Sequence, residues 1–164
     1  MGKAGDVLYT SANRSSTATG VDSLRASLVA KAYKGNISDS PLADGEQLNL
    51  VGYSYGSVMQ AQAALKLAKN GVSVDNLVLV GSPISSDSDL YKELSSNKNI
   101  KNIIRYDIKG DKLSNPKSFS EYISGARENT SDSGHHFDLA RPGSKADQRI
   151  QEAVNTIKKQ GVEN

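Results

Sequence analysis

The segment around Ser54 constrains the fold of this chain more than any other feature. The pentapeptide Gly52-Tyr53-Ser54-Tyr55-Gly56 lies between an apolar run, residues 48–51, and an alanine-rich stretch, residues 58–68. The apolar run predicts a strand and the alanine-rich stretch predicts a helix, so Ser54 is expected at the sharp bend between them. A serine at such a bend needs a strained backbone, and we expect both glycines to be required because a Cβ at either position would crowd it.

Short apolar runs elsewhere predict further strands, and the segments between them predict helices. Strands are predicted at residues 7–9, 48–51, 74–80 and 103–106. The first predicted helix carries Val21, Leu24, Leu28 and Ala32 on its apolar face and ends at Lys34-Gly35-Asn36, before a surface loop over residues 36–46. The next has Val58, Ala61, Leu65 and Ala68 on one face and ends at Asn70-Gly71, and a weaker helix covers residues 90–94. The last is capped by Ser144 and Asp147 and presents Ile150, Ala153, Val154 and Ile157.

Strands that alternate with helices predict an α/β fold, a small and mostly parallel sheet with helices on both faces. We expect about four or five strands, and we expect the strand at residues 48–51 to be buried on both faces. In such sheets the functional groups lie at the carboxyl ends of the strands, where Ser54 is predicted. Residues 1–164 are expected to form a single domain, and the strand-like start suggests a piece of a larger protein.

Composition excludes several classes of function. The chain has 20 basic and 18 acidic residues mixed along its length, for a net charge of +2, so we expect no nucleic-acid partner. No apolar run approaches the roughly 20 residues that span a bilayer, so we expect a soluble domain without a transmembrane segment. The absence of cysteine excludes disulfides and thiolate chemistry, and it is compatible with a cytoplasmic or an exported protein.

A serine hydroxyl becomes a good nucleophile only when an imidazole takes its proton and a carboxylate orients that imidazole. The chain has two histidines, His135 and His136, in a polar loop ahead of the last helix. We favour His136 as the base because Phe137 and Leu139 could pack against its ring, with His135 as its rival. A metal ion bridged by these neighbours is not expected, and neither is a cofactor.

The orienting acid is expected between the serine and the histidine in chain order. Asp111 is the first choice because it follows a predicted strand after a short turn, Ile108-Lys109-Gly110. Asp107, at the end of that strand, is the rival. Four other aspartates are expected to cap helices or to lie at the surface: Asp87, Asp89, Asp132 and Asp138.

From residue 48 to residue 136 the chain resembles the α/β-hydrolase superfamily, and more narrowly the class 3 lipase type of esterase. The similar segments are the pentapeptide around Ser54, the strand exit Val80-Gly81-Ser82-Pro83, and residues 105–113 followed by Pro116. The resemblance implies Ser54 as the nucleophile and Asp111 as the catalytic acid, with Asp107 at an Asn-like position. The serine-rich and cysteine-free character also looks like bacterial lipase-like effector domains carried by larger delivery proteins.

The resemblance implies a serine hydrolase that cleaves carboxylic esters, lipid esters among them, through an acyl-Ser54 intermediate. The glycine-rich oxyanion signature of the superfamily is missing, so the expected donors are the backbone N–H of Tyr55 and a group near Ser11 or Ala12. Thioesterase and acyltransferase activities would use the same residues. The alternative from another class is a hydrolase-like binding module that has lost turnover.

Overall fold

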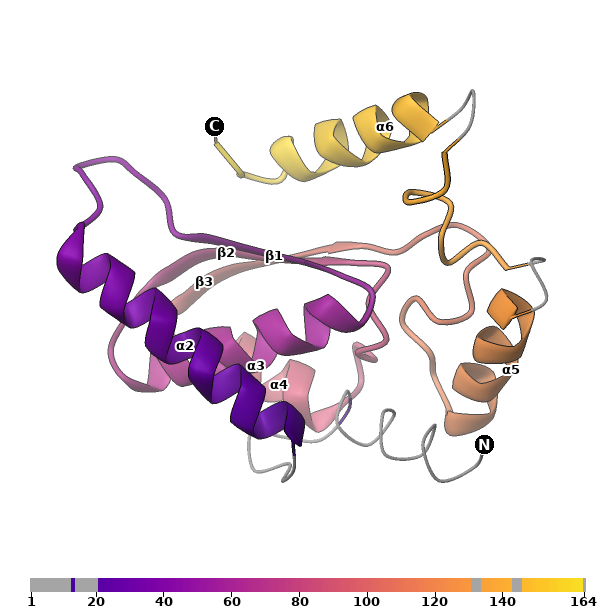
Figure 1. Ribbon diagram of the computed structural model, residues 1–164, viewed down its shortest axis with the longest axis horizontal. Helices are drawn as coiled ribbons and strands as arrows, with labels where there is room; N and C mark the ends of the chain where they lie inside the picture. The colour runs from indigo at the N-terminus through magenta and orange to yellow at the C-terminus, as the bar shows by residue number, and fades with distance from the viewer. Residues whose placement is uncertain (1–12, 14–20, 131–133, 143–145, 164) are drawn as a thin grey trace.

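The structure is a computed structural model that describes residue 13 and residues 21–130, 134–142 and 146–163. Strands and helices alternate through most of this part of the chain (Figure 1). The elements are, in order, α2 (Val21–Asp39), β1 (Asn49–Tyr53), α3 (Tyr55–Lys69), β2 (Val74–Val80), α4 (Asp89–Ser96), β3 (Ile100–Tyr106), α5 (Phe119–Thr130) and α6 (Ala146–Lys158). The predicted strand at residues 7–9 and the predicted cap Ser144 lie outside the described residues.

The described sheet consists of three parallel strands in the spatial order β1-β2-β3. β2 is the central strand and β3 begins three residues before the predicted position, at Ile100. The register aligns Tyr53 with Val80 and Val80 with Tyr106, so the three strands end at one level. The loops that follow them, including Ser54, therefore lie together at the carboxyl edge of the sheet.

Helices cover both faces of this sheet, which confirms the predicted α/β class. α2, α3 and α4 lie on one side and α6 on the other, while α5 lies beyond the carboxyl ends of the strands (Figure 1). Three strands are fewer than the four or five expected, and this number refers to the described residues alone. α5 was not predicted from the sequence.

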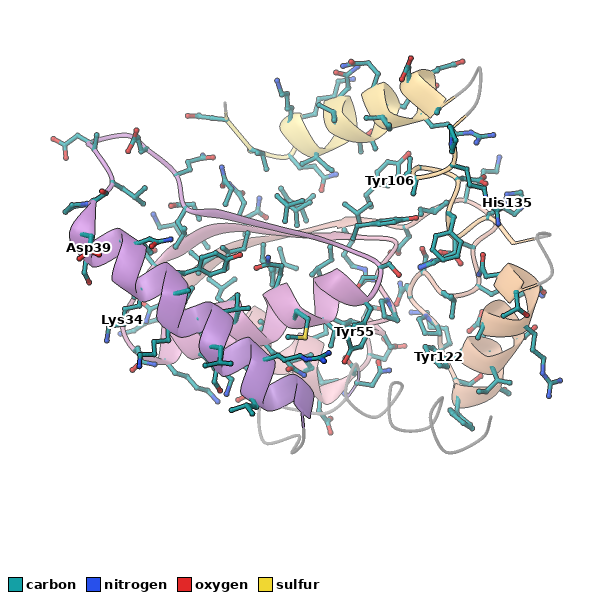
Figure 2. All side chains as sticks on the ribbon, viewed as in Figure 1. Lys34, Asp39, Tyr55, Tyr106, Tyr122 and His135 are labelled. Carbon is teal, nitrogen blue, oxygen red and sulfur yellow. The ribbon has the colours of Figure 1, made fainter. Side chains whose placement is uncertain are left out.

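Helix α2 differs from its prediction in length and in orientation. It continues through Gly35 to Asp39, and Figure 2 shows Lys34 and Asp39 on the same continuous helix. Leu24 and Leu28, predicted to face the core, are about 60% exposed, whereas Ala26 and Ala30 are buried. The reason is the partner: α2 packs on the alanine-rich α3, and small side chains on both helices permit a close approach.

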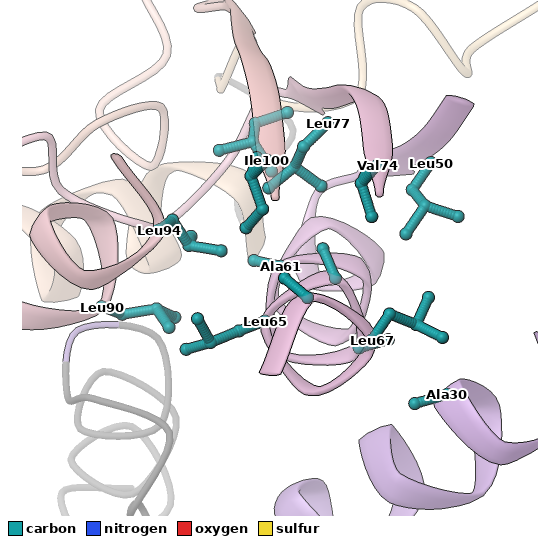
Figure 3. Packing of buried hydrophobic residues seen from close by; sticks show 14 of the residues in the cluster. Ala30, Leu50, Ala61, Leu65, Leu67, Val74, Leu77, Leu90, Leu94 and Ile100 are labelled. Carbon is teal, nitrogen blue, oxygen red and sulfur yellow. The ribbon is translucent and has the colours of Figure 1, made fainter. Parts of the chain in front are cut away.

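The main core lies between the sheet and α3, α2 and α4 (Figure 3). Its members on α3 include the four predicted residues, Val58, Ala61, Leu65 and Ala68, all fully or almost fully buried. α3 is buried on nearly every side, because helices flank it as well as the sheet. Burial of each leucine in this layer stabilises the fold by roughly 1.5–3 kcal/mol.

The second face of the sheet has a smaller core. Val78, Val80 and Ile104 are buried there under Leu139 and Ile157 of the C-terminal part. α6 packs mainly on β3, and Val51 of β1 is 54% exposed. The prediction that this strand is buried on both faces was therefore wrong. Ile150 and Val154, predicted on the apolar face of α6, are also partly exposed, at 44% and 37%, while Ala153 is buried.

Side-chain amides join the amino ends of the three strands. Asn76 donates to Asn49 Oδ1 (2.7 Å), and Asn102 donates to Asn76 Oδ1 (3.0 Å). The same amide ladder holds the chain after α6, because Asn102 also donates to the carbonyl oxygen of Gln160 (2.9 Å) and Gln47 donates to that of Gly161 (3.1 Å). Asn76 is almost fully buried, so these bonds satisfy polar groups that water does not reach.

None of the helices in the described part of the chain is both long enough and apolar enough to span a membrane.

Candidate active site

Ser54 joins β1 directly to α3 and has a strained backbone. Its φ of 54° and ψ of −130° lie outside the conformations that residues with a side chain normally adopt, at a cost of about 1–3 kcal/mol. A hydrogen bond from the Ser54 N–H to the carbonyl oxygen of Val80 (2.9 Å) ties the bend to the end of β2. This strand-serine-helix bend is the local structure that the pentapeptide predicted.

The two glycines of the pentapeptide differ in what they contribute. A Cβ on Gly52 would collide with Ser57 Cα and would lie 2.7 Å from the Gly56 carbonyl oxygen. At Gly56 a Cβ would meet no atom within 4 Å. The expectation that both positions must be glycine is therefore wrong for Gly56, because position 56 already lies on the outer surface of α3 and faces away from the bend.

Two buried serines, Ser57 and Ser82, form hydrogen bonds next to the Ser54 bend. Ser57 Oγ donates to the carbonyl oxygen of Ser54 (2.5 Å) and lies 2.7 Å from Ser82 Oγ, and both serines are fully buried. Ser82 belongs to the strand exit after β2 that the sequence had singled out, but its contact with the bend was not foreseen. These bonds satisfy a carbonyl that the strained turn directs into the protein.

His136 faces Ser54. Its Nε2 is hydrogen-bonded to Ser54 Oγ, and its Nδ1 lies 2.7 Å from Asp111 Oδ2. The side chains of His136 and Asp111 are 3% and 0% exposed. The ring of Phe137 packs edge-on against the imidazole with 5.1 Å between centroids, which agrees with the packing that favoured His136. The structure thus brings the three sequence-predicted side chains together in the order serine, imidazole and carboxylate.

The rival residues lie elsewhere. His135 is 55% exposed and pairs through Nδ1 with Asp138 Oδ2 (3.0 Å), and Figure 2 shows it at the periphery of the molecule. Asp107 accepts hydrogen bonds from Arg105 (2.9 Å) and Asn115 (3.2 Å). Since Asn115 also accepts from the N–H of Ser86 (2.8 Å), Asp107 helps to join the loops after β2 and β3.

Helix α5 holds the two loops that carry Asp111 and His136. A Cβ on Gly125 would lie 2.9 Å from the backbone nitrogen of Leu113, so the helix contacts the Asp111 loop directly. Asn129 accepts a hydrogen bond from the N–H of His136 (3.2 Å). A Cβ on Gly134 would collide with the Asn129 side chain, so the His136 loop passes close to the end of α5. These contacts explain how the histidine is positioned by a helix.

The Asp111 carboxylate receives three hydrogen bonds. Oδ2 accepts from His136 Nδ1 and from Ser114 Oγ (2.8 Å), while Oδ1 accepts from the backbone N–H of Leu113 (2.8 Å). Burial alone would raise the pKa of Asp111, but the bonds from His136, Leu113 and Ser114 outweigh it and lower that pKa below its ordinary value of 3.8. Asp111 is therefore ionised at neutral pH and can stabilise a proton on the imidazole.

Replacement of Ser114 by alanine tests this electrostatic arrangement. A carboxyl whose pKa is lowered in the folded state stabilises the fold above its unfolded pKa, and this stability is lost as the pH falls through the folded pKa. Without the Ser114 hydroxyl, which also accepts from the Ile108 N–H (3.2 Å), the pKa of Asp111 should rise. We expect Ser114→Ala to lower the free energy of unfolding by about 1–3 kcal/mol at neutral pH. In urea titrations the difference from wild type should shrink as the pH falls below 3.8; a difference that grows on acidification would contradict this account.

The predicted oxyanion donors are placed only in part. Tyr55 is the first residue of α3, so its backbone N–H belongs to the helix terminus beside Ser54. Ser11 and Ala12 lie outside the described residues. Within the described ranges, no three histidine, aspartate or glutamate side chains are grouped so as to hold a metal ion.

The parallel sheet is covered on both faces, and a serine bend follows the carboxyl end of β1. Together these features define a small α/β protein of hydrolase type. A family model described as alpha/beta hydrolase matches residues 6–99, more than half of the chain. The protein therefore belongs to this alpha/beta hydrolase family. The matched range contains Ser54 and ends before Asp111 and His136. Comparisons with curated proteins and with solved structures gave no significant match.

Proposed function

We propose that the protein is a serine hydrolase that cleaves carboxylic esters, in the manner of class 3 lipase-like esterases, through an acyl-Ser54 intermediate. The observation that carries this proposal is the continuous hydrogen-bonded line from Ser54 Oγ through the His136 ring to Asp111 Oδ2. A strained serine, a buried imidazole and an ionised carboxylate in this order are the parts that acyl transfer requires.

In the proposed reaction, Ser54 Oγ attacks the carbonyl carbon of the ester while His136 Nε2 takes the hydroxyl proton. The negative charge moves to the carbonyl oxygen, where the backbone N–H of Tyr55 is a donor. Collapse of this intermediate breaks the bond to the alcohol, which leaves with the proton from His136. Water then attacks the acyl-Ser54 ester and gives a proton to His136. As the bond between the acyl carbon and Ser54 Oγ breaks, His136 returns this proton to Ser54 Oγ, and the acid is released. Asp111 keeps the imidazole oriented and stabilises its charged form.

A fluorophosphonate probe tests the proposal, because it reacts with serines that are activated in this way. Labelling should occur on Ser54 in the wild-type protein and vanish in Ser54→Ala. Ser95→Ala is the matched control, since Ser95 is an exposed serine on α4 whose hydroxyl bonds within its own helix. A folded wild-type protein that is not labelled, and that turns over no p-nitrophenyl ester, would favour the binding module. Labelling of Ser54 without ester turnover would point to a thioester or acyl-transfer reaction with the same residues.

A further inference from the structure

Tyr53, the residue directly before Ser54, contacts the candidate base in two ways. Its hydroxyl donates a hydrogen bond to the backbone carbonyl oxygen of His136. Its ring stacks on the imidazole of His136, with 5.8 Å between the ring centroids and 14° between the planes. One side chain therefore contacts both the backbone and the ring of the same residue, 83 positions further along the chain.

The Tyr53 ring is itself held firmly. It packs against the small core on the second face of the sheet, next to Val80 at the end of the central strand. A Cβ on Gly81 would come within 3.3 Å of the Tyr53 ring and within 2.9 Å of Ile108 Cδ1, so the chain passes close to the ring. Gly81 also has a φ of 53°, a conformation that favours glycine. The tyrosine thus links a rigid strand end to the His136 loop.

The contacts of His136 leave one polar group for chemistry. Its N–H donates to Asn129 Oδ1, its carbonyl oxygen accepts from Tyr53, and its Nδ1 is bonded to Asp111. Nε2 is the group that faces Ser54. Burial and the nearby charges of Asp111 and Asp138 raise the pKa of Tyr53 to about 12, against a smaller opposite effect of Arg141. The phenol therefore stays protonated at neutral pH and remains a donor.

We infer that Tyr53 is a positioning residue for His136: its hydrogen bond and its stacked ring set the imidazole against Ser54. The catalytic part of this inference rests on the proposed function. The contacts of Tyr53 with His136 are independent of it. Tyr53 and Ser54 are consecutive residues. The residue that supports the base and the nucleophile itself therefore lie at the same rigid strand end. The nucleophile and the base are then held in a fixed relative position, even though 82 positions separate them in sequence.

Tyr53→Phe is the sharpest test, because it removes the hydroxyl and keeps the ring. We expect kcat for a p-nitrophenyl ester to fall by roughly 10- to 100-fold, because a small displacement of a catalytic group has effects of this size. KM should remain close to the wild-type value, since Tyr53 is not assigned a contact with the substrate. Tyr53→Leu, which removes the stacked ring as well, should lower kcat further. Tyr106→Phe is the matched control, since Tyr106 packs against the same core and the described residues show no hydrogen bond of its hydroxyl.

A second readout does not depend on activity. In proton NMR spectra, the signal of the proton shared by His136 Nδ1 and Asp111 should weaken or exchange faster in Tyr53→Phe, and it should be unchanged in Tyr106→Phe. If Tyr53→Phe has wild-type kcat and an unchanged signal, the positioning role is wrong. If the wild-type protein is inactive but the NMR signal responds as expected, the proposed function fails and the positioning of His136 by Tyr53 stands.

Discussion

His136→Ala is expected to lower kcat/KM for ester substrates by roughly 10⁴- to 10⁶-fold, the size of effect seen when the base of a serine triad is removed. Within the described residues, Nε2 of His136 is the group that is hydrogen-bonded to Ser54 Oγ and can take its proton, so the alanine variant lacks this base. The same substitution at His135 should change kcat/KM by less than about threefold, as that side chain is about half exposed, is paired with Asp138 and, in the described part of the chain, has no hydrogen bond to Ser54. Steady-state kinetics on purified variants measures both effects.

The comparison of the two histidines controls for folding. His136 is buried, so its loss could also weaken the fold, and thermal unfolding of each variant should accompany the kinetics. His136→Gln retains a polar side chain of similar length and should be as inactive as the alanine variant. A His136→Ala protein that keeps most of its activity, or a His135→Ala protein that loses it, would refute the assignment of the base.

Gly52→Ala is expected to destabilise the fold severely, because the added Cβ would collide with backbone atoms. The new Cβ would overlap the Ser57 backbone. Neither β1 nor α3 can move apart to make room, because both are packed in the main core. Overpacking of this kind costs about 1–3 kcal/mol and occasionally more, and here the obstacle is backbone rather than a flexible side chain. We expect a loss of at least about 3 kcal/mol in the free energy of unfolding, or failure to fold.

Gly56→Ala is the matched control for this prediction. The position lies in the first turn of α3, and an added methyl group would meet open space. Alanine is the better helix former by about 0.5–1 kcal/mol, so this variant should be as stable as the wild type or slightly more stable. Urea denaturation of both variants distinguishes the two glycines, and equal destabilisation by both would show that the bend is crowded on each side after all.

Much of the fold followed from the sequence because its elements have strong local signals. The apolar residues of β2 and the alanine-rich face of α3 predict those elements directly, and Ser54 is marked by the glycine that its bend requires. α2 was harder to predict, because its apolar leucines lie outward while small alanines face α3. Which face of a helix is buried depends here on the partner helix, and hydrophobic periodicity does not contain that information.

α5 could not be predicted for a related reason. It buries only Tyr122 and Gly125, so it has almost no apolar stripe. Gly125 resembles a helix breaker in sequence, yet it is explained by the close approach of the Leu113 backbone. The sequence predicted Ser54, Asp111 and His136 as site residues, and their side chains are hydrogen-bonded to one another in the structure. Their catalytic roles stay predictions until the variants are measured. Tyr53, Ser57, Ser82 and Ser114 were missed as supporting residues because their partners are distant in the chain or belong to a turn that only the fold reveals.

The amide ladder lies at the amino ends of the strands, whereas Ser54 lies at their carboxyl ends. Asn49, Asn76 and Asn102 fasten the segment after α6 at the end of the sheet far from Ser54. The end of the covering helix is therefore attached through strand residues, while Arg149 in its first part donates to the Asp138 carbonyl oxygen (3.3 Å) in the loop that carries His136. We therefore expect substitutions in the loops around Ser54 to leave Val78 and Ile104 buried.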